Sequence, residues 1–181
     1  MNKLQAIVQE MQTVLERPEL EGWEQIAALL SGKRIFLIGE GRSGLMGKSF
    51  AMRLMHLGAD VYVIGETITP SIAKDDVLVA VSGSGTTKQA IWVAQKAKEL
   101  GCTVIAVTTD PSSALGSLAD QILHVPAATK YRKANESVSI QPLGSLFDQC
   151  AHIVFDAICL QYASLQSEDN GSAFHRHSNM E

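Results

Sequence analysis

The sequence predicts an α/β fold, a three-layer α-β-α sandwich with a five-stranded parallel sheet and an N-terminal helical extension. Short continuous apolar runs, such as residues 34–38 and 77–81, are typical of strands that are buried on both faces. These runs alternate with segments of helical periodicity, the order that gives parallel strands with right-handed crossovers. The 181 residues fit a single domain, since no repeat or low-complexity segment divides them.

The helical extension occupies residues 1–31. Apolar residues from Ile7 to Leu15 mark one face of a first helix, which Pro18 ends. A second apolar-periodic segment begins at about Trp23 and is closed by Gly32. We expect these two helices to pack on the domain or on a neighbouring subunit.

The domain itself is expected to span residues 32–166. Its other strands are predicted at residues 61–64, 103–107 and 122–125. Its helices are predicted at residues 43–56, from the glycine-rich turn at 82–87 to about residue 100, and at residues 113–119. A polar loop at 127–140 precedes Pro142, which is expected to be the first residue of a long apolar helix that reaches about residue 165. Residues 167–181 read as a polar tail.

The composition is that of a folded protein, with 46% hydrophobic and 19% charged residues. The net charge of −4 argues against a nucleic-acid partner, which usually requires a basic face. No apolar stretch approaches the roughly 20 residues that cross a bilayer, and the first residues do not form a signal peptide. We therefore expect no membrane partner and a cytoplasmic location.

The three cysteines, Cys102, Cys150 and Cys159, all lie in apolar segments. Their spacing matches neither a Cys-x-x-Cys pair nor a cysteine–histidine zinc site. We expect buried structural thiols, no disulfide and no metal site.

Two glycine-rich turns carry the chemistry that the residues predict. The first is Gly39-Glu40-Gly41-Arg42-Ser43-Gly44, and the second, which we call the hydroxyl loop, is Ser82-Gly83-Ser84-Gly85-Thr86-Thr87. Each follows a predicted strand and opens a predicted helix, so that backbone N–H groups and the helix dipole favour an anion there. Glycine permits close approach of the backbone, and the hydroxyls add donors without charge. Both turns therefore indicate a phosphorylated ligand.

The first turn also satisfies the Gly-x-Gly-x-x-Gly pattern of dinucleotide-binding folds, and Glu66 lies where such a fold would bind a ribose. Against this alternative, the chain leaves little room for a second substrate domain, and a nicotinamide enzyme would not require the hydroxyl loop. The hydroxyl loop could also be a tight turn that merely caps a helix, but one cap does not need so many hydroxyls.

Several longer motifs are more specific than the glycine turns. They are Gly41-Arg42-Ser43-Gly44-Leu45-Met46, the segment 48–56, Ser82-Gly83-Ser84-Gly85, Ile140-Gln141-Pro142-Leu143-Gly144-Ser145-Leu146-Phe147 and His177-Ser178-Asn179-Met180-Glu181. With these, the sequence resembles the sugar isomerase (SIS) domain family, and within it the 6-phospho-3-hexuloisomerases. The resemblance runs nearly end to end.

The resemblance implies the interconversion of D-arabino-hex-3-ulose 6-phosphate and D-fructose 6-phosphate through a cis-enediol. This reaction belongs to the ribulose monophosphate pathway of formaldehyde fixation or detoxification. The resemblance also implies that no metal or organic cofactor takes part. It further implies a homo-oligomer, commonly a tetramer arranged as a dimer of dimers, with active sites near the subunit contacts.

Site residues follow from the same resemblance. Ser43, Ser82, Ser84 and Thr87 would bind the phosphate; Gly83, Gly85 and Thr86 complete the loop, and Arg42 could add a positive charge. The proton acceptor of the family is a glutamate in Gly-Ser-Leu-Phe-Glu-Gln, which falls at Asp148 here. Thr86 also departs from the family, which usually has a glutamate at that position. Both departures bear on the identity of the sugar.

Asp148 is our candidate base, placed in the second turn of the helix that Pro142 was expected to begin; the alternative is a surface acid near a helix N-terminus. His177 is our candidate donor to the enediolate, which requires the tail to fold over its own site or a neighbouring subunit's. The alternatives are a disordered tail for His177 and an exposed structural arginine for Arg42.

Two other functions fit the same fold. One is another aldose–ketose phosphosugar isomerase, and the other is a non-catalytic regulator that binds a sugar phosphate. The regulator is disfavoured because no DNA-binding helix pair adjoins the domain and residues 1–31 lack a basic face.

Overall fold

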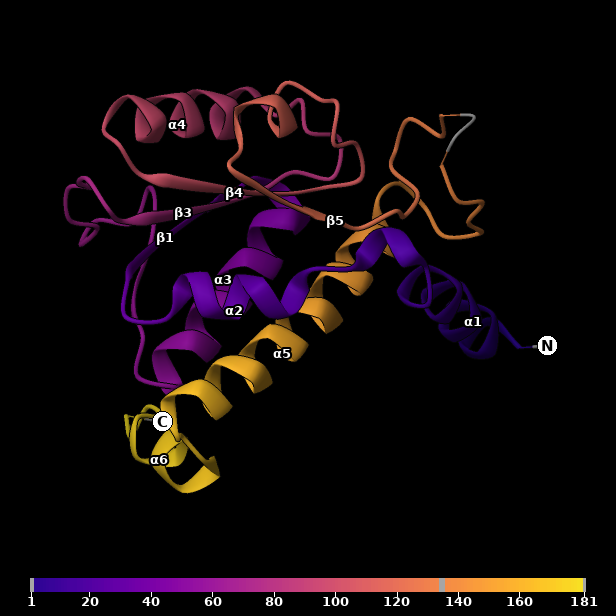
Figure 1. The fold of residues 1–181 in the computed structure, drawn as a ribbon. Coiled ribbons are helices and arrows are strands. Elements are labelled where there is room, and N and C mark those ends of the chain that lie inside the picture. Colours follow the sequence, from indigo (N-terminus) through magenta and orange to yellow (C-terminus); the bar gives the residue numbers. More distant parts are fainter. Residues whose placement is uncertain (1, 134–135, 181) are drawn as a thin grey trace.

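The computed structural model of the chain describes residues 2–133 and 136–180. Within these residues a five-stranded parallel sheet has the order β2-β1-β3-β4-β5 (Figure 1). The strands are β1 (Arg34–Gly39), β2 (Asp60–Val63), β3 (Val77–Val81), β4 (Thr103–Thr108) and β5 (Gln121–His124). The helices are α1 (Lys3–Leu15), α2 (Trp23–Leu30), α3 (Gly41–His56), α4 (Lys88–Glu99), α5 (Ser145–Gln166) and α6 (Asn170–His175), with short 3-10 turns at Pro18–Leu20 and Gly116–Leu118.

Both faces of the sheet are covered, as the continuous apolar strands require. On β3, Val77, Val79 and Val81 join the core formed with α2, α3 and α5, whereas Leu78 and Ala80 join the core formed with α4. The predicted three-layer α-β-α sandwich is confirmed, with α4 on one face and α2, α3 and α5 on the other (Figure 1).

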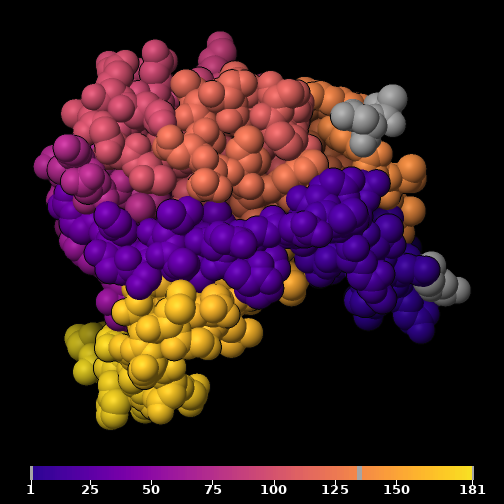
Figure 2. Space-filling view, viewed as in Figure 1, coloured from indigo at the N-terminus to yellow at the C-terminus, as the bar shows by residue number. Residues whose placement is uncertain are grey.

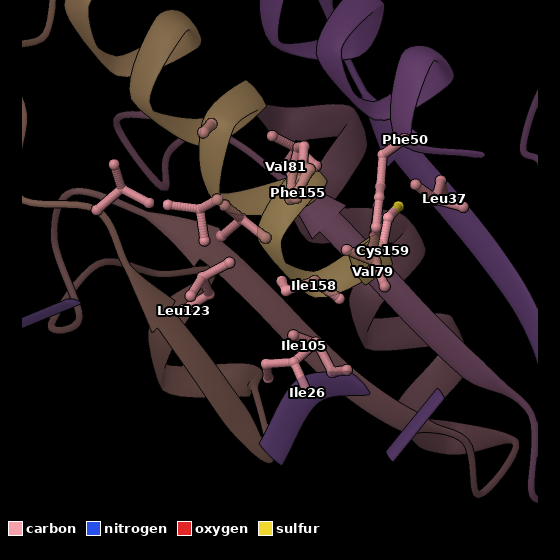
Figure 3. Packing of buried hydrophobic residues seen from close by; sticks show 14 of the residues in the cluster. Ile26, Leu37, Phe50, Val79, Val81, Ile105, Leu123, Phe155, Ile158 and Cys159 are labelled. Carbon is pink, nitrogen blue, oxygen red and sulfur yellow. The ribbon is translucent and has the colours of Figure 1, made fainter. Parts of the chain in front are cut away.

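The larger core lies between the sheet and the helix pair α3 and α5. Phe50 of α3 and Phe155 of α5 stack with ring centroids 4.5 Å apart and an interplanar angle of 10°, above strand residues such as Val79 and Ile105 (Figure 3). This packing fixes how the start of α5 lies relative to the start of α3, which is where the candidate site is found.

The strand order places a topological switch point between β1 and β3. These strands pair in register from Ile35 with Val77 to Gly39 with Val81. The chain leaves β1 toward β2 at one edge and leaves β3 toward β4 in the other direction. Their outgoing loops therefore diverge and leave a crevice at the carboxyl ends of the strands, the usual ligand position in such sheets.

The N-terminal extension packs on the domain. Val14 of α1 and Leu30 of α2 are fully buried in the same core as α5. The first turns of α1 project from the body of the molecule (Figures 1 and 2), and there Leu4 is 75% and Val8 61% exposed.

Three sequence-based expectations are wrong in detail. Pro142 does not begin the long helix, because Leu143 adopts a left-handed φ of +54° and α5 starts only at Ser145; Asp148 therefore lies in the first turn. The predicted helix at 113–119 is reduced to a 3-10 turn, with Gly116 packed against the Pro111 carbonyl. The polar tail contains the helix α6, which a capping box at Asp169 begins. Glu181, the last residue of the C-terminal motif, lies outside the described residues.

The expected burial of the three cysteines is confirmed, and Cys102, Cys150 and Cys159 are free thiols. Burial raises the pKa of Cys150 and of Cys159 to about 12. In the described part of the chain, no helix is long and apolar enough to cross a membrane. Those same residues contain no group of histidine, cysteine and carboxylate side chains that could hold a metal ion.

Candidate active site

A cleft of about 540 Å³ opens at the carboxyl ends of β1 and β3, within the size range of small-molecule sites. Four segments of the chain build its walls. They are the first glycine turn and start of α3, the hydroxyl loop, the segment after β5, and the start of α5. The lining residues are Glu40, Gly41, Arg42, Ser43, Ser82, Gly83, Ser84, Thr86, Thr87, Thr129, Lys130, Tyr131, Leu143, Gly144, Phe147 and Asp148.

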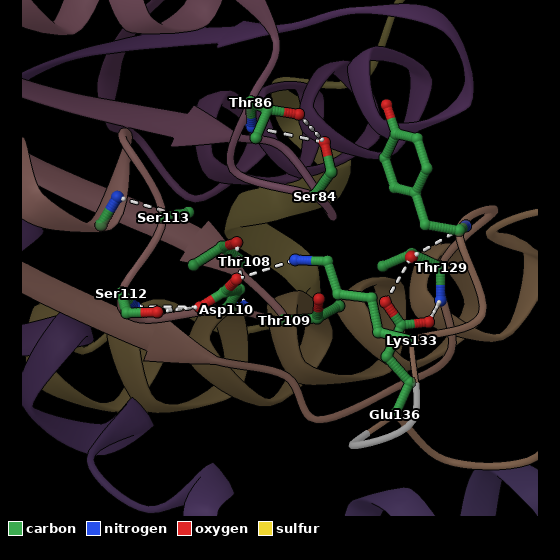
Figure 4. Close-up of polar contacts among 12 residues, drawn as sticks. Ser84, Thr86, Thr108, Thr109, Asp110, Ser112, Ser113, Thr129, Lys133 and Glu136 are labelled. Atoms are coloured by element: carbon green, nitrogen blue, oxygen red, sulfur yellow. Dashed lines mark hydrogen bonds and ion pairs between the residues drawn. The ribbon is translucent and has the colours of Figure 1, made fainter.

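The hydroxyl loop is held in shape by β4. The Gly83 carbonyl accepts hydrogen bonds from the Thr109 amide at 3.0 Å, from Thr109 Oγ1 at 2.8 Å and from Thr108 Oγ1 at 3.2 Å. The hydroxyls pair within the loop, with Ser82 Oγ 2.7 Å from Thr87 Oγ1 and Ser84 Oγ 2.8 Å from Thr86 Oγ1 (the latter pair in Figure 4).

The loop presents backbone donors at the start of a helix. Gly85 has a left-handed φ of +63° and turns the chain so that α4 begins at Lys88, with Thr87 as its N-cap residue. The amides of Gly83, Ser84 and Thr87 make no hydrogen bond to other described residues. Amides at a helix N-terminus together with hydroxyls form an anion-binding arrangement.

The first glycine turn brings α3 close to the sheet. A Cβ atom on Gly44 would lie 2.4 Å from the Gly39 carbonyl oxygen, so that only glycine permits this contact. The close approach sets Arg42 and Ser43 in the first turn of α3, at the edge of the cleft.

Asp148 is the buried charged group of the cleft. Its side chain is only 4% exposed. Its Oδ2 accepts a hydrogen bond from Arg42 Nε at 2.9 Å, and its Oδ1 accepts one from Ser43 Oγ at 3.1 Å. The Arg42 side chain is 62% exposed, and its terminal nitrogens make no hydrogen bond with described residues. The starts of α3 and α5 thus meet through a carboxylate and a guanidinium that still faces the cleft.

Nearly all of the candidate residues from the sequence therefore come together. Gly85 does not line the cleft, but it shapes the loop that does. Glu66 lies after β2, outside the cleft, with its carboxylate 3.3 Å from Lys48 Nζ. Glu66 therefore lines a different hollow from the one that the two glycine turns share.

His177 does not lie in the cleft of its own chain. Its ring stacks on that of His56 with centroids 5.2 Å apart, and His56 is the last residue of α3. Arg42 and His56 are separated by about 20 Å along this helix, since each residue adds about 1.5 Å. Burial, Arg53 and His177 together lower the pKa of His56.

Sequence reasoning missed several lining residues. Thr129, Lys130 and Tyr131 follow β5, while Glu40 and Leu143 border residues already singled out. The rule that ligands bind beyond the carboxyl ends of parallel strands applies to β5 as well and would have indicated the first three.

Residues 28–153 match the SIS domain family. The chain belongs to this family. This match confirms the resemblance that the sequence indicated. The matched residues include all those that line the cleft, among them the hydroxyl loop and Asp148.

Several curated relatives of this chain carry the name of an isomerase. A protein of Bacillus subtilis named 3-hexulose-6-phosphate isomerase is 43% identical over 153 residues, 84% of this chain and 83% of its own length. A protein of Mycobacterium gastri with the same name is 40% identical over 162 residues, 87% of this chain and 81% of its own. These relatives confirm the expectation that the chain is an isomerase.

A solved structure has the same fold as this chain. A protein from Methanococcus jannaschii, whose crystal structure was reported to infer a 3-hexulose-6-phosphate isomerase function, superposes with a TM-score of 0.85. It is 29% identical, and the match covers 100% of each chain.

Proposed function

We propose that the chain interconverts D-arabino-hex-3-ulose 6-phosphate and D-fructose 6-phosphate in the ribulose monophosphate pathway. The observation that carries the proposal is the buried carboxylate of Asp148 in the same cleft as the hydroxyl loop. An anion-binding loop next to a carboxylate suits a phosphorylated substrate that must lose and regain a proton on carbon. The names of the curated relatives support this choice of sugar.

In this proposal the phosphate binds at the hydroxyl loop. The amides of Gly83, Ser84 and Thr87 and the hydroxyl of Ser82 donate to its oxygens, and the N-terminus of α4 adds its dipole. Binding the phosphate there directs the sugar carbons toward the start of α5.

The reaction moves a carbonyl from C3 to C2. Asp148 takes the proton from C2, the electron pair forms the C2–C3 double bond, and O3 gains a proton to give the cis-enediol. The hydroxyl on C2 then loses its proton, and Asp148 returns a proton to C3. Arg42 keeps Asp148 oriented and presents its terminal nitrogens to the developing enediolate.

The direct test is a panel of sugar phosphates with the purified protein. We expect conversion of fructose 6-phosphate to the 3-hexulose phosphate and no turnover of arabinose 5-phosphate or sedoheptulose 7-phosphate. Turnover confined to either of the latter would support another aldose–ketose isomerase instead. Binding of sugar phosphates without any turnover would support a regulator.

Asp148→Asn tests the base. It keeps the shape of the side chain but removes its basicity, so kcat should fall by about 10²- to 10⁴-fold while the sugar phosphate still binds. Asp156→Asn, on the exposed face of the same helix, is the matched control and should keep full activity. Retained turnover in Asp148→Asn would exclude Asp148 as the base.

We also propose that His177 serves the cleft of a neighbouring subunit in a cytoplasmic homotetramer, because it lies far from the cleft of its own chain. His177→Gln should then lower kcat, whereas His175→Gln, on the same tail, should not. Mixed oligomers of Asp148→Asn and His177→Gln subunits should regain activity, since some sites would combine two intact residues. No recovery in oligomers shown to be mixed would contradict the shared site.

A further inference from the structure

The segment after β5 forms one wall of the cleft, and several of its described residues are held by hydrogen bonds and an ion pair. The carboxylate of Glu136 accepts hydrogen bonds from the Thr129 amide at 2.8 Å and from Thr129 Oγ1 at 2.5 Å. The Lys133 ammonium donates to Asp110 Oδ2 at 3.0 Å, and Arg132 donates to the Gln141 carbonyl (Figure 4 shows the first two anchors). Hydrogen bonds from Ser112 and Lys133 lower the pKa of Asp110, which favours its charged form in this pair.

Lys130 lies between these anchored residues and lines the cleft. Its ammonium lies 5.1 Å from the ring centroid of Tyr131, a cation–π contact that leaves its three N–H donors for another partner. The backbone on either side is held, so only the side chain of the lysine has to be ordered when it binds a partner.

The charges that line the cleft indicate what that partner is. They are the carboxylates of Glu40 and Asp148 and the cations of Arg42 and Lys130, and their formal charges cancel. Arg42 is already paired with Asp148. A phosphate monoester adds about −1.5 to −2 charges at neutral pH, and the hydroxyl loop contributes no formal charge to offset them.

The segment also lies on the correct side of the cleft. Val125 donates its amide to the Thr108 carbonyl at 2.9 Å, and Lys133 reaches Asp110, so both contacts are with the end of β4 and the loop that follows it. The same strand end holds the Gly83 carbonyl of the hydroxyl loop.

We propose that Lys130 is a substrate-binding residue that donates to the phosphate bound at the hydroxyl loop. This inference rests on the proposed function only in taking a phosphorylated substrate. It assigns to Lys130 the charge neutralisation that the hydroxyls and amides cannot supply. The reaction at C2 and C3 does not involve it.

The test measures inorganic phosphate binding by calorimetry in the full chain, without turnover. Lys130→Met should weaken phosphate binding by about ten- to a hundredfold, the range for a lost charge-assisted hydrogen bond, and should raise KM for the sugar phosphate with kcat little changed. Lys130→Arg should keep most of the affinity. Lys88→Met is the matched control, because Lys88 follows the hydroxyl loop directly and is exposed but does not line the cleft.

Three results would overturn the proposal. The first is unchanged phosphate affinity in Lys130→Met, and the second is an equal loss in Lys88→Met, which would indicate a diffuse field. The third is a fall in kcat with unchanged phosphate affinity, which would place Lys130 at the enediolate. Since binding is measured at equilibrium, a wild-type chain that binds phosphate through Lys130 but isomerises nothing would refute only the proposed function.

Discussion

Gly85 provides the sharpest stability prediction, because two separate costs of replacing it can be read from the structure. Its φ of +63° is left-handed, and a Cβ atom there would lie 1.9 Å from Ser113 Oγ and 2.4 Å from Ser113 Cβ. Rotation of the serine hydroxyl would relieve the first contact but not the second. Gly85→Ala must therefore move the backbone of the hydroxyl loop or that of residue 113.

A left-handed alanine costs about 1–2 kcal/mol, and forcing extra volume into a packed position costs about 1–3 kcal/mol. Gly85→Ala should thus lower the free energy of unfolding by about 2–5 kcal/mol. Gly32 has a similar φ of +69°, and no atom lies within 4 Å of the Cβ that alanine would add there. Gly32→Ala should therefore cost only about 1–2 kcal/mol, the cost of a left-handed alanine.

Urea denaturation followed by circular dichroism measures both variants. The difference between them should be about 1–3 kcal/mol, and Gly85→Ala should also weaken phosphate binding. The double variant Gly85→Ala/Ser113→Gly lacks both Ser113 atoms that the new Cβ would overlap. Adding alanine at residue 85 should therefore cost less stability in the Ser113→Gly chain than in the wild-type chain. Equal losses in Gly85→Ala and Gly32→Ala would refute the steric argument.

Two further predictions concern carboxylates that tie distant segments together. Burial alone would raise the pKa of Asp76, but the hydrogen bond from Arg34 and the Ala73 amide lower it below its ordinary 3.8. The stabilisation is therefore present above pH 4 and lost as the pH falls through the lower folded value, so Asp76→Asn should cost about 1–3 kcal/mol near neutrality and progressively less as the pH falls through that value. Glu10 of α1 accepts hydrogen bonds from Ser139 Oγ, the Ile140 amide and Gln141 Nε2. In urea titrations Glu10→Ala should cost about 1–2 kcal/mol, and Gln9→Ala, on the exposed side of α1, almost nothing.

The fold was largely predictable because the strands are continuous apolar runs that only a doubly covered sheet can bury. The two glycine turns were also predictable, because in each case a strand, a glycine turn and a helix follow one another directly in the sequence. Each β-strand prediction depended on neighbouring residues alone.

The rest depends on contacts between residues far apart in the chain. Nothing near Asp148 in the sequence indicates that Arg42 pairs with it, because the pair forms only when α3 and α5 pack side by side. The true start of α5 was missed because the left-handed turn at Leu143 has no glycine to mark it. Lys130 has no motif at all, and its role follows from the anchors on either side.

The anchors of the segment after β5 have a consequence for how such a protein can diversify. Glu136, Asp110 and Glu10 hold this wall through side chains that do not touch the hydroxyl loop. The hydroxyl loop is braced by the same end of β4, but through hydrogen bonds to the Gly83 carbonyl that involve no residue of that wall. A substitution at a position such as Leu143 removes none of these contacts, so the sugar that the cleft accepts can change while the hydroxyl loop and Lys130 still hold the phosphate.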